Sequence, residues 1–198
     1  MKTELCADAI NKKGKVRIAG WAENIRSIGK IKFISIRDIS GNIQITLVKG
    51  KISEELFNKV DEITKESVLL VEGVLKNNKI APGGKEIIPS KIEIISKSAQ
   101  PVPLNISGKI ESDLSSRLNW RFLDLRMPKN MAVFKIQNVI SNSFREHFFK
   151  KEFIEIQPPC VISSASEGGA DLYEIKYFEK KAYLAQSPQL YKQMCIAA

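Results

Sequence analysis

The sequence is poor in residues on which several protein classes depend. It has three cysteines in 198 residues, and Cys6, Cys160 and Cys195 are far apart and odd in number. This spacing supports neither a disulfide framework nor a zinc site, and it favours a reducing, cytoplasmic environment. No apolar run approaches the roughly 18 residues of a membrane span, and residues 1–5 lack the apolar core of a secretory signal. We therefore expect a cytoplasmic protein without a metal site or a membrane partner.

Two signatures of catalysis are also missing. A Ser-His-Asp triad would have to use His147, the one histidine, but this residue lies in a helical pattern that predicts a packed helix residue. No Gly-Lys pair is followed by Ser or Thr, so the chain has no P-loop for phosphates. We therefore expect neither a Ser-His-Asp triad nor a P-loop in this chain.

What is present in excess is positive charge, and it is unevenly placed. Residues 1–50 contain 10 basic and 4 acidic residues, whereas residues 51–100 contain 8 of each. A basic N-terminal module indicates a polyanionic partner such as nucleic acid, although a charged surface also serves solubility.

Residues 15–95 have the pattern of a small β-rich domain. Short β-branched runs are separated by Gly or polar turns and predict strands at 16–18, 31–37, 43–47, 68–75 and 87–95. From Ser53, acidic residues and apolar residues at helical spacing predict one capped helix between the third and fourth strands. Five strands with one such helix are typical of an OB-fold, a barrel that binds single-stranded nucleic acid on its second and third strands.

Alternation within those two strands assigns side chains to faces. If Ile34 and Ile36 point into the barrel, Phe33 points outward, and the same period places Gln44 and Thr46 outward on the next strand. An exposed Phe beside an exposed Gln suits base stacking with recognition of a base edge. The alternative is a strand buried on both faces, with Phe33 in the core.

The β-rich pattern ends before residues 98–130, which have a different composition. The Pro-Val-Pro sequence at 101–103 fits neither a helix nor a central strand, so we predict a hinge. A basic stretch at 117–126 leads to Pro128 and a long amphipathic helix predicted over about 131–151. Its broad apolar face requires a partner, either a catalytic sheet or a second subunit. The run at 153–159 predicts a strand ended by Pro158 and Pro159.

Two clusters near the end of the chain suggest an amino-acid pocket. Residues 166–173 read Ser-Glu-Gly-Gly-Ala-Asp-Leu-Tyr, in which Glu167 beside two glycines can meet an amino group while the backbone closes over a ligand. After Pro188, Gln189 and Lys192 are three residues apart, and on a helix both point to one side and can bind a carboxylate. The alternative is a polar loop followed by an ordinary amphipathic helix.

Taken in order, these pieces resemble the aspartyl-tRNA synthetases, class II aminoacyl-tRNA synthetases in which an anticodon-binding OB-fold precedes the catalytic domain. The resemblance spans nearly the whole chain. Residues 166–173 resemble the flipping loop of the family, residues 183–193 resemble its amino-acid-binding segment, and residues 117–126 resemble the hinge and domain entry shared with lysyl and asparaginyl relatives. The Glu-Gly-Gly form of the loop is similar to that of archaeal and eukaryotic cytosolic enzymes.

The resemblance implies a role for each matching residue. Glu167 faces the amino group of L-aspartate, and the segment Gln189, Leu190, Tyr191 and Lys192 binds the rest of it. Pro159 matches the proline of the dimer motif, which implies a homodimer. In the N-terminal domain, Arg26, Phe33, Gln44 and Glu86 match positions that contact the anticodon of tRNA(Asp). Pro82, with Glu23, lies in the region that decides whether tRNA(Asn) is also charged.

We therefore expect an α+β multidomain chain. Its parts are a five-stranded OB-fold barrel at 1–100, a hinge or linker at 101–130 and, at 131–198, the start of an antiparallel α/β catalytic domain of class II. The family uses ATP and Mg, and its two later motifs that bind them have no counterpart before Ala198, so we expect an inactive N-terminal fragment. The implied reaction attaches aspartate to ATP as aspartyl-adenylate and then to the 3′ end of tRNA. Two alternatives stay open: an asparaginyl-tRNA synthetase, and a non-catalytic tRNA-binding protein with a decayed synthetase domain.

Overall fold

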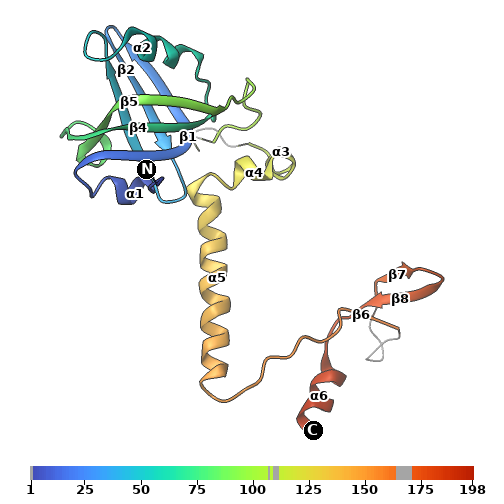
Figure 1. Cartoon of the computed structure of the whole chain (residues 1–198). Coiled ribbons are helices and arrows are strands. Elements are labelled where there is room, and N and C mark those ends of the chain that lie inside the picture. The colour runs from blue at the N-terminus through green and yellow to red at the C-terminus, as the bar shows by residue number, and fades with distance from the viewer. Residues whose placement is uncertain (1, 107, 109–111, 164–170) are drawn as a thin grey trace. The chain divides into compact units, whose positions relative to one another are not determined.

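Five strands close into a barrel at the N-terminal end of the chain in a computed structural model (Figure 1). They are β1 (Gly14–Ile28), β2 (Ile31–Arg37), β3 (Asn42–Val48), β4 (Val68–Asn77) and β5 (Lys85–Ser96), in the order β1-β2-β3-β5-β4. Neighbours are antiparallel except β3 and β5, and β4 pairs with β1 to close the barrel. The structure describes residues 2–106, 108, 112–163 and 171–198. The predicted OB-fold is confirmed; β2 has the predicted bounds, and the other four strands are longer than predicted.

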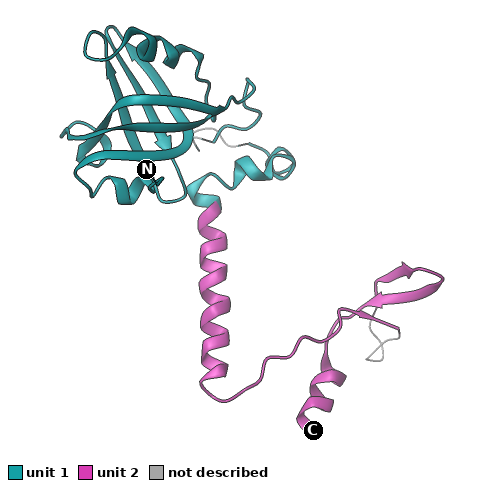
Figure 2. Ribbon diagram, in the orientation of Figure 1, with its two compact units in different colours: residues 1–130 teal, residues 131–198 magenta. Residues whose placement is uncertain are grey.

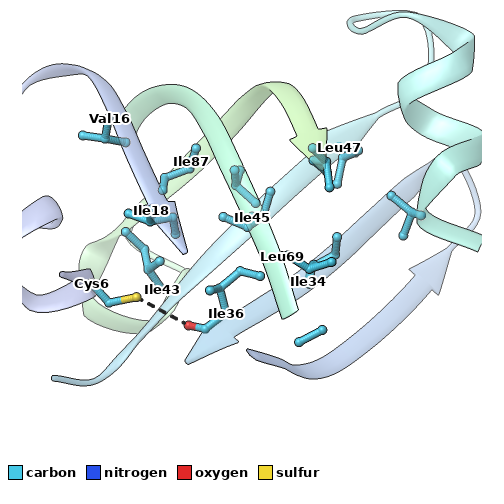
Figure 3. Close-up of a cluster of buried hydrophobic side chains, with 14 of the residues drawn as sticks. Cys6, Val16, Ile18, Ile34, Ile36, Ile43, Ile45, Leu47, Leu69 and Ile87 are labelled. Carbon is cyan, nitrogen blue, oxygen red and sulfur yellow. Dashed lines mark hydrogen bonds between the residues drawn. The ribbon is translucent and has the colours of Figure 1, made fainter. Parts of the chain in front are cut away.

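Isoleucine dominates the inside of the barrel because alternate residues of each strand face inward (Figure 3). Each side chain in the centre of the core is at most 1% exposed and belongs to one cluster. Burial of one such side chain stabilises the fold by about 1.5–3 kcal/mol. The central members are Val16, Ile18, Ile34, Ile36, Ile43, Ile45, Leu47, Leu69 and Ile87.

The predicted helix between β3 and β4 is α2 (Glu54–Lys59), continued by the short 3-10 helix η1 (Val60–Glu62). Ser53 caps it, since its hydroxyl accepts a hydrogen bond from the Leu56 amide at 3.3 Å. Phe57 and Val60 are buried against the core cluster. These contacts confirm the helix and its capping residue.

A short helix that the sequence pattern does not predict, α1 (Cys6–Ala9), closes one end of the barrel. The Asp38 carboxylate accepts a hydrogen bond from the Cys6 amide at 2.7 Å. Burial of the Cys6 thiol, reinforced by the nearby Asp38 charge, raises its pKa to about 12. Although burial opposes it, hydrogen bonds from Ser40 and from the Cys6 amide lower the pKa of Asp38.

The chain divides into two compact units, residues 1–130 and 131–198 (Figure 2). The first unit includes two helices of the predicted hinge, α3 (Leu114–Asn119) and α4 (Arg121–Asp124). The Asp124 carboxylate is fully buried and accepts hydrogen bonds from Arg117, Arg121 and Asn130. These bonds stabilise the turn between the helices, since a buried carboxylate requires charged or polar partners.

The second unit contains α5 (Pro128–Phe149), apart from its first residues, and a small antiparallel sheet in the order β6-β8-β7. The strands are β6 (Val161–Ile162), β7 (Glu174–Tyr177) and β8 (Lys180–Leu184), followed by α6 (Gln189–Ala197). The apolar residues predicted along the long helix are exposed, among them Val133, Ile136 and Phe144 at 60–65%. No helix in the described ranges is long and apolar enough to span a membrane.

Two expectations for this unit are wrong. Residues 153–159 form no strand, because no described segment offers them a hydrogen-bonding partner, and Pro158 and Pro159 lack amide protons. His147 lies on α5 as predicted, but it is exposed rather than packed, since nothing in the described unit covers that part of the helix.

Candidate functional site

A β-bulge at Glu23 organises the outer face of the barrel. Ala22 pairs with Ile36 and Asn24 pairs with Ser35, so Glu23 is an extra residue without a partner on β2. The extra residue reverses the alternation of β1 and places Asn24 and Arg26 on the outer face. Arg26 then lies opposite Phe33 in the register, with its guanidinium carbon 5.8 Å from the centre of the Phe33 ring.

Phe33 lies on the outer face as predicted. Ile34 and Ile36 are fully buried, whereas Phe33 is half-buried and outside the core cluster. On β3, Ile43 and Ile45 face inward and Gln44 faces outward. The alternative with Phe33 in the core is therefore wrong.

These side chains meet in a cavity of about 170 Å³. Four predicted residues from four segments line it: Arg26 of β1, Phe33 of β2, Gln44 of β3 and Pro82 of the β4–β5 loop. A cavity this small, below the ~300–1,000 Å³ of typical ligand pockets, suits one flat ring of a larger ligand. The remaining lining residues are Glu23, Asn24, Ser35, Asn42 and Ile43.

Glu86, the fifth predicted residue, does not line this cavity, but it is hydrogen-bonded to Gln44, which does. Its Oε2 accepts hydrogen bonds from the Thr46 hydroxyl at 2.6 Å, the Asn78 amide group at 2.9 Å and the Gln44 amide group at 3.3 Å. The cluster forms because β3 and β5 run parallel with Gln44 opposite Glu86. Thr46 lies on the same face as Gln44, as predicted, but it is only 6% exposed and is therefore not accessible to a ligand.

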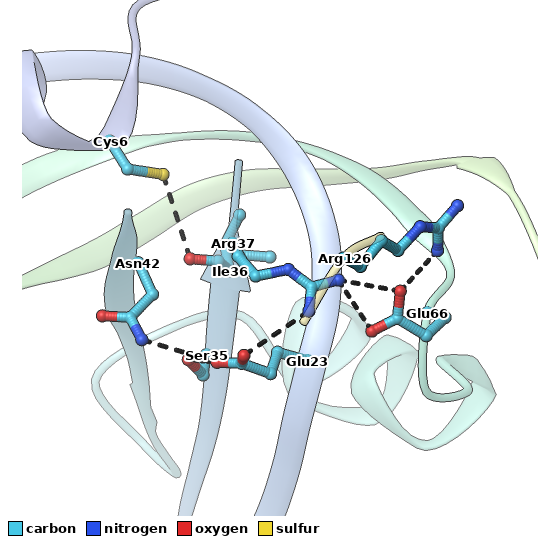
Figure 4. A network of polar contacts seen from close by, with 8 residues as sticks. All are labelled: Cys6, Glu23, Ser35, Ile36, Arg37, Asn42, Glu66 and Arg126. Atoms are coloured by element: carbon cyan, nitrogen blue, oxygen red, sulfur yellow. Dashed lines mark hydrogen bonds and ion pairs between the residues drawn. The ribbon is translucent and has the colours of Figure 1, made fainter. Parts of the chain in front are cut away.

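A second polar network connects the cavity with the hinge (Figure 4). Glu23 accepts from the Ser35 hydroxyl at 3.1 Å and is 3.6 Å from Arg37. Arg37 also donates to Glu66 at 2.9 and 3.0 Å, and Arg126, just beyond α4, donates to the same carboxylate. The sequence carries no signal for the bulge or for this network, since both depend on pairing between distant segments.

The charge of the site favours an anion or an electron-rich ring. Among the described residues, the Arg26 side chain has no acidic partner, and its guanidinium lies over the Phe33 ring. A guanidinium beside an aromatic face, next to an amide, can stack on a base and hydrogen-bond its edge or the adjoining phosphate. The basic excess of residues 1–50 is consistent with this chemistry.

The predicted amino-acid site lies in the second unit. Pro188 precedes the first residue of α6, and its carbonyl accepts a hydrogen bond from the Lys192 amide at 3.0 Å. Gln189, Leu190, Tyr191 and Lys192 therefore occupy the first turn of a helix, and all four are exposed. Glu167, Gly168 and Gly169 lie outside the described residues, whereas the end of the glycine-containing segment, residues 171–173, is described.

Hydrogen bonds join the end of β8 to the end of the glycine-containing segment. The Leu184 amide donates to the Tyr173 carbonyl at 3.0 Å, and the Gln186 side chain donates to the Asp171 carbonyl at 3.3 Å. These bonds place the end of the glycine-containing segment beside β8. Pro159, the predicted dimer-motif residue, is exposed in a segment without regular structure.

The described residues contain no group of three His, Cys, Asp or Glu side chains that could hold a metal ion.

Two family models match different parts of the chain. Residues 16–95 match the family model of the OB-fold nucleic acid binding domain, and residues 113–198 match that of the tRNA synthetases class II (D, K and N). Residues 113–198 thus have the sequence of a class II tRNA synthetase domain. The first match covers the barrel, and the second covers α3 and α4 of the first unit together with the whole second unit.

Curated synthetases similar to the chain are aspartate ligases. The chain is 50% identical over 184 residues to the aspartate–tRNA(Asp/Asn) ligase of Methanopyrus kandleri and 46% identical over 183 residues to the aspartate–tRNA(Asp) ligase of Pyrococcus horikoshii. These alignments cover 93% and 92% of the chain but 43% and 42% of the relatives. The chain thus spans less than half the length of these synthetases.

Solved structures similar to the chain include both asparaginyl-tRNA and aspartyl-tRNA synthetases. The asparaginyl-tRNA synthetase of Pyrococcus horikoshii, complexed with asparaginyl-adenylate, superposes with a TM-score of 0.88 at 34% identity, covering 100% of the chain and 46% of that structure. A putative aspartyl-tRNA synthetase of Leishmania major superposes with a TM-score of 0.82 at 30% identity, covering 92% and 37%.

Proposed function

We propose that this chain is the anticodon-binding part, and part of the aspartate site, of an aspartate–tRNA ligase. The observation that carries the proposal is the convergence of Arg26, Phe33, Gln44 and Pro82 on one cavity, in a chain 50% identical to an aspartate–tRNA ligase. In this proposal Phe33 stacks on an anticodon base, and Gln44, held by Glu86, hydrogen-bonds a base edge. Pro82 contributes to the choice between tRNA(Asp) and tRNA(Asn), to be measured by charging both tRNAs.

The proposed full activity is the ATP-dependent activation of L-aspartate and its transfer to the 3′ end of tRNA(Asp). In this activity, the chain would bind and orient the amino acid. Lys192 and Gln189 would hold carboxylate oxygens by charge-assisted and neutral hydrogen bonds, and Glu167 would accept from the ammonium group. ATP and Mg would be bound by residues outside the described part of this chain. Catalysis then depends on positioning rather than on a protein nucleophile.

The second candidate is an asparaginyl-tRNA synthetase, which the TM-score of 0.88 with such an enzyme supports. Lys192 favours aspartate, because an ammonium beside the side chain of the ligand pairs with a carboxylate and would remain unpaired beside an amide.

A chimera tests the choice between aspartate and asparagine. In this chimera, the chain replaces the matching part of the Pyrococcus horikoshii aspartate–tRNA ligase. Lys192→Ala should weaken aspartate binding at least tenfold in calorimetry, whereas Lys180→Ala, an exposed lysine of β8, should have no effect. Unchanged aspartate affinity in Lys192→Ala would refute the assignment.

Catalytic competence is tested with the same chimera. We expect aspartate-dependent exchange of pyrophosphate into ATP by the chimera and none by the chain alone. Robust exchange by the 198-residue chain would overturn our interpretation that it lacks the ATP-binding motifs. A chimera that binds tRNA but never activates aspartate would instead support the third reading, a non-catalytic tRNA-binding protein.

The assembly is also proposed by analogy with the family. We propose a cytoplasmic homodimer in which Pro159 and the apolar face of α5 contribute to the contact between subunits. The exposure of Val133, Ile136 and Phe144 on α5 is the observation that supports a partner surface. Sedimentation of the chimera tests this proposal, since Ile136→Asp should shift a dimer to monomer.

A further inference from the structure

A second, larger cavity adjoins the first on the outside of the barrel. Its volume is about 680 Å³, four times that of the base-sized cavity, and the two share Glu23 and Asn24. Apart from Glu23, none of the residues that the sequence analysis assigned to a site lines it. Its other lining residues are Arg37, Lys65, Glu66, Gln100, Val102, Leu104, Asn105 and Ile106.

Four charged side chains line this cavity, and Lys65 is the one that does not belong to the network of Glu23, Arg37 and Glu66. Arg37 is committed to Glu66 and Glu23, and Glu66 also accepts from Arg126. Lys65 has no acidic partner among the described residues, and its side chain is exposed. The cavity therefore contains a positive charge that is available to an anionic ligand.

The backbone around Lys65 is fixed even though its side chain is exposed. The Gln100 side chain donates to the Lys65 carbonyl at 2.9 Å, and the Glu66 amide donates to Ala22 on β1 at 2.8 Å. Ser67 closes the turn by donating to Thr64 at 3.1 Å. The ammonium group is therefore presented at the edge of the cavity from a rigid turn, which lowers the entropic cost of binding.

The remaining lining suits a flat, partly apolar group. Val102, Leu104 and Ile106 supply apolar surface from the chain segment that follows the barrel, and Asn24 and Gln100 add hydrogen-bonding groups. A nucleotide combines these requirements, since its base has apolar faces, its ribose has hydroxyls and its phosphate is an anion.

We propose that this cavity binds the nucleotide that flanks the anticodon next to the base held in the first cavity, with its base against Val102 and Leu104 and its phosphate on Lys65. The shared wall of Glu23 and Asn24 supports this assignment, because an RNA strand leaving the first cavity on that side enters the second. The inference rests on the proposed function and extends it beyond the anticodon.

The test measures binding of a fluorescent tRNA(Asp) anticodon stem-loop to the whole chain by anisotropy, at several salt concentrations. Lys65→Ala should weaken binding about three- to tenfold and reduce the salt slope by about 0.7, the value for one phosphate contact on a single strand. Lys65→Arg should retain both. Lys15→Ala removes an exposed lysine of β1 that lines neither cavity and should match the wild type.

An abasic nucleotide next to the anticodon tests the apolar wall in the same assay. It should weaken binding by the wild type severalfold at one flanking position. The inference is wrong if Lys65→Ala binds the normal RNA, and the wild type binds the abasic RNAs, as tightly as the wild type binds the normal RNA. If Phe33→Ala still binds weakly in that case, the proposed function stands. If neither Phe33→Ala nor Lys65→Ala changes the affinity, the proposed function fails as well.

Discussion

Replacing Phe33 with Ala separates the binding face of the barrel from its core. Phe33 is half-buried on the outer face, lines the base-sized cavity and has the Arg26 guanidinium 5.8 Å from its ring. Loss of one stacked base costs about 1–3 kcal/mol, which is about 5- to 150-fold in affinity. The lost contact with Arg26 is present without RNA, so its loss lowers the free energy of unfolding, by about 0.5–1 kcal/mol at an exposed site.

The neighbouring residue provides the matched control. Ile34 is fully buried in the core cluster, so Ile34→Ala should lower the free energy of unfolding by about 2–5 kcal/mol. Phe33→Ala should reduce stability less and RNA affinity more. Thermal unfolding and anisotropy with the anticodon stem-loop measure the two effects on the same samples.

One pattern of results would refute this reasoning. If Phe33→Ala unfolds as easily as Ile34→Ala, Phe33 contributes to the core rather than to binding. If it is stable and binds RNA as tightly as the wild type, the cavity is not the base-binding site.

Three further outcomes follow from the cap and burial contacts. Cys160 and Cys195 are exposed and should react with iodoacetamide at pH 8 long before Cys6, because at a pKa of about 12 only about one Cys6 thiol in 10⁴ is ionised. Asp38 has a folded pKa below its ordinary 3.8, so its stabilisation is present above pH 4 and is lost as pH falls through the folded pKa; Asp38→Asn should flatten that part of the stability curve in acid titration. Ser53→Ala should cost about 1 kcal/mol in chemical denaturation, since it removes the cap of α2.

Much of the barrel could be predicted because local patterns set it. Isoleucine at every second position of β2 and β3 fixes which face is inside, and Ser53 followed by two glutamates marks the start of α2. The outward position of Phe33 follows from the same alternation. These features require no knowledge of which strands pair.

Features that depend on distant pairing could not be predicted in this way. The bulge at Glu23 leaves no mark in composition, yet it brings Arg26 opposite Phe33. The grouping of Thr46, Asn78 and Glu86 arises from the parallel pairing of β3 with β5.

The second unit shows the same limit. Residues 153–159 have strand composition but form no strand, because a strand requires a partner and none is present among the described residues. The apolar face of α5 was predictable, but what covers it was not.

The most direct test of the central claim is the affinity of this chain for the anticodon stem-loop of tRNA(Asp), compared with the same RNA carrying one changed anticodon base. Each mismatched base should weaken binding by about 1–3 kcal/mol, or about 5- to 150-fold. Gln44→Ala should remove most of this discrimination at one position while leaving the barrel folded, because Gln44 is outside the core cluster. Equal affinity of the wild-type chain for both RNAs would contradict the account.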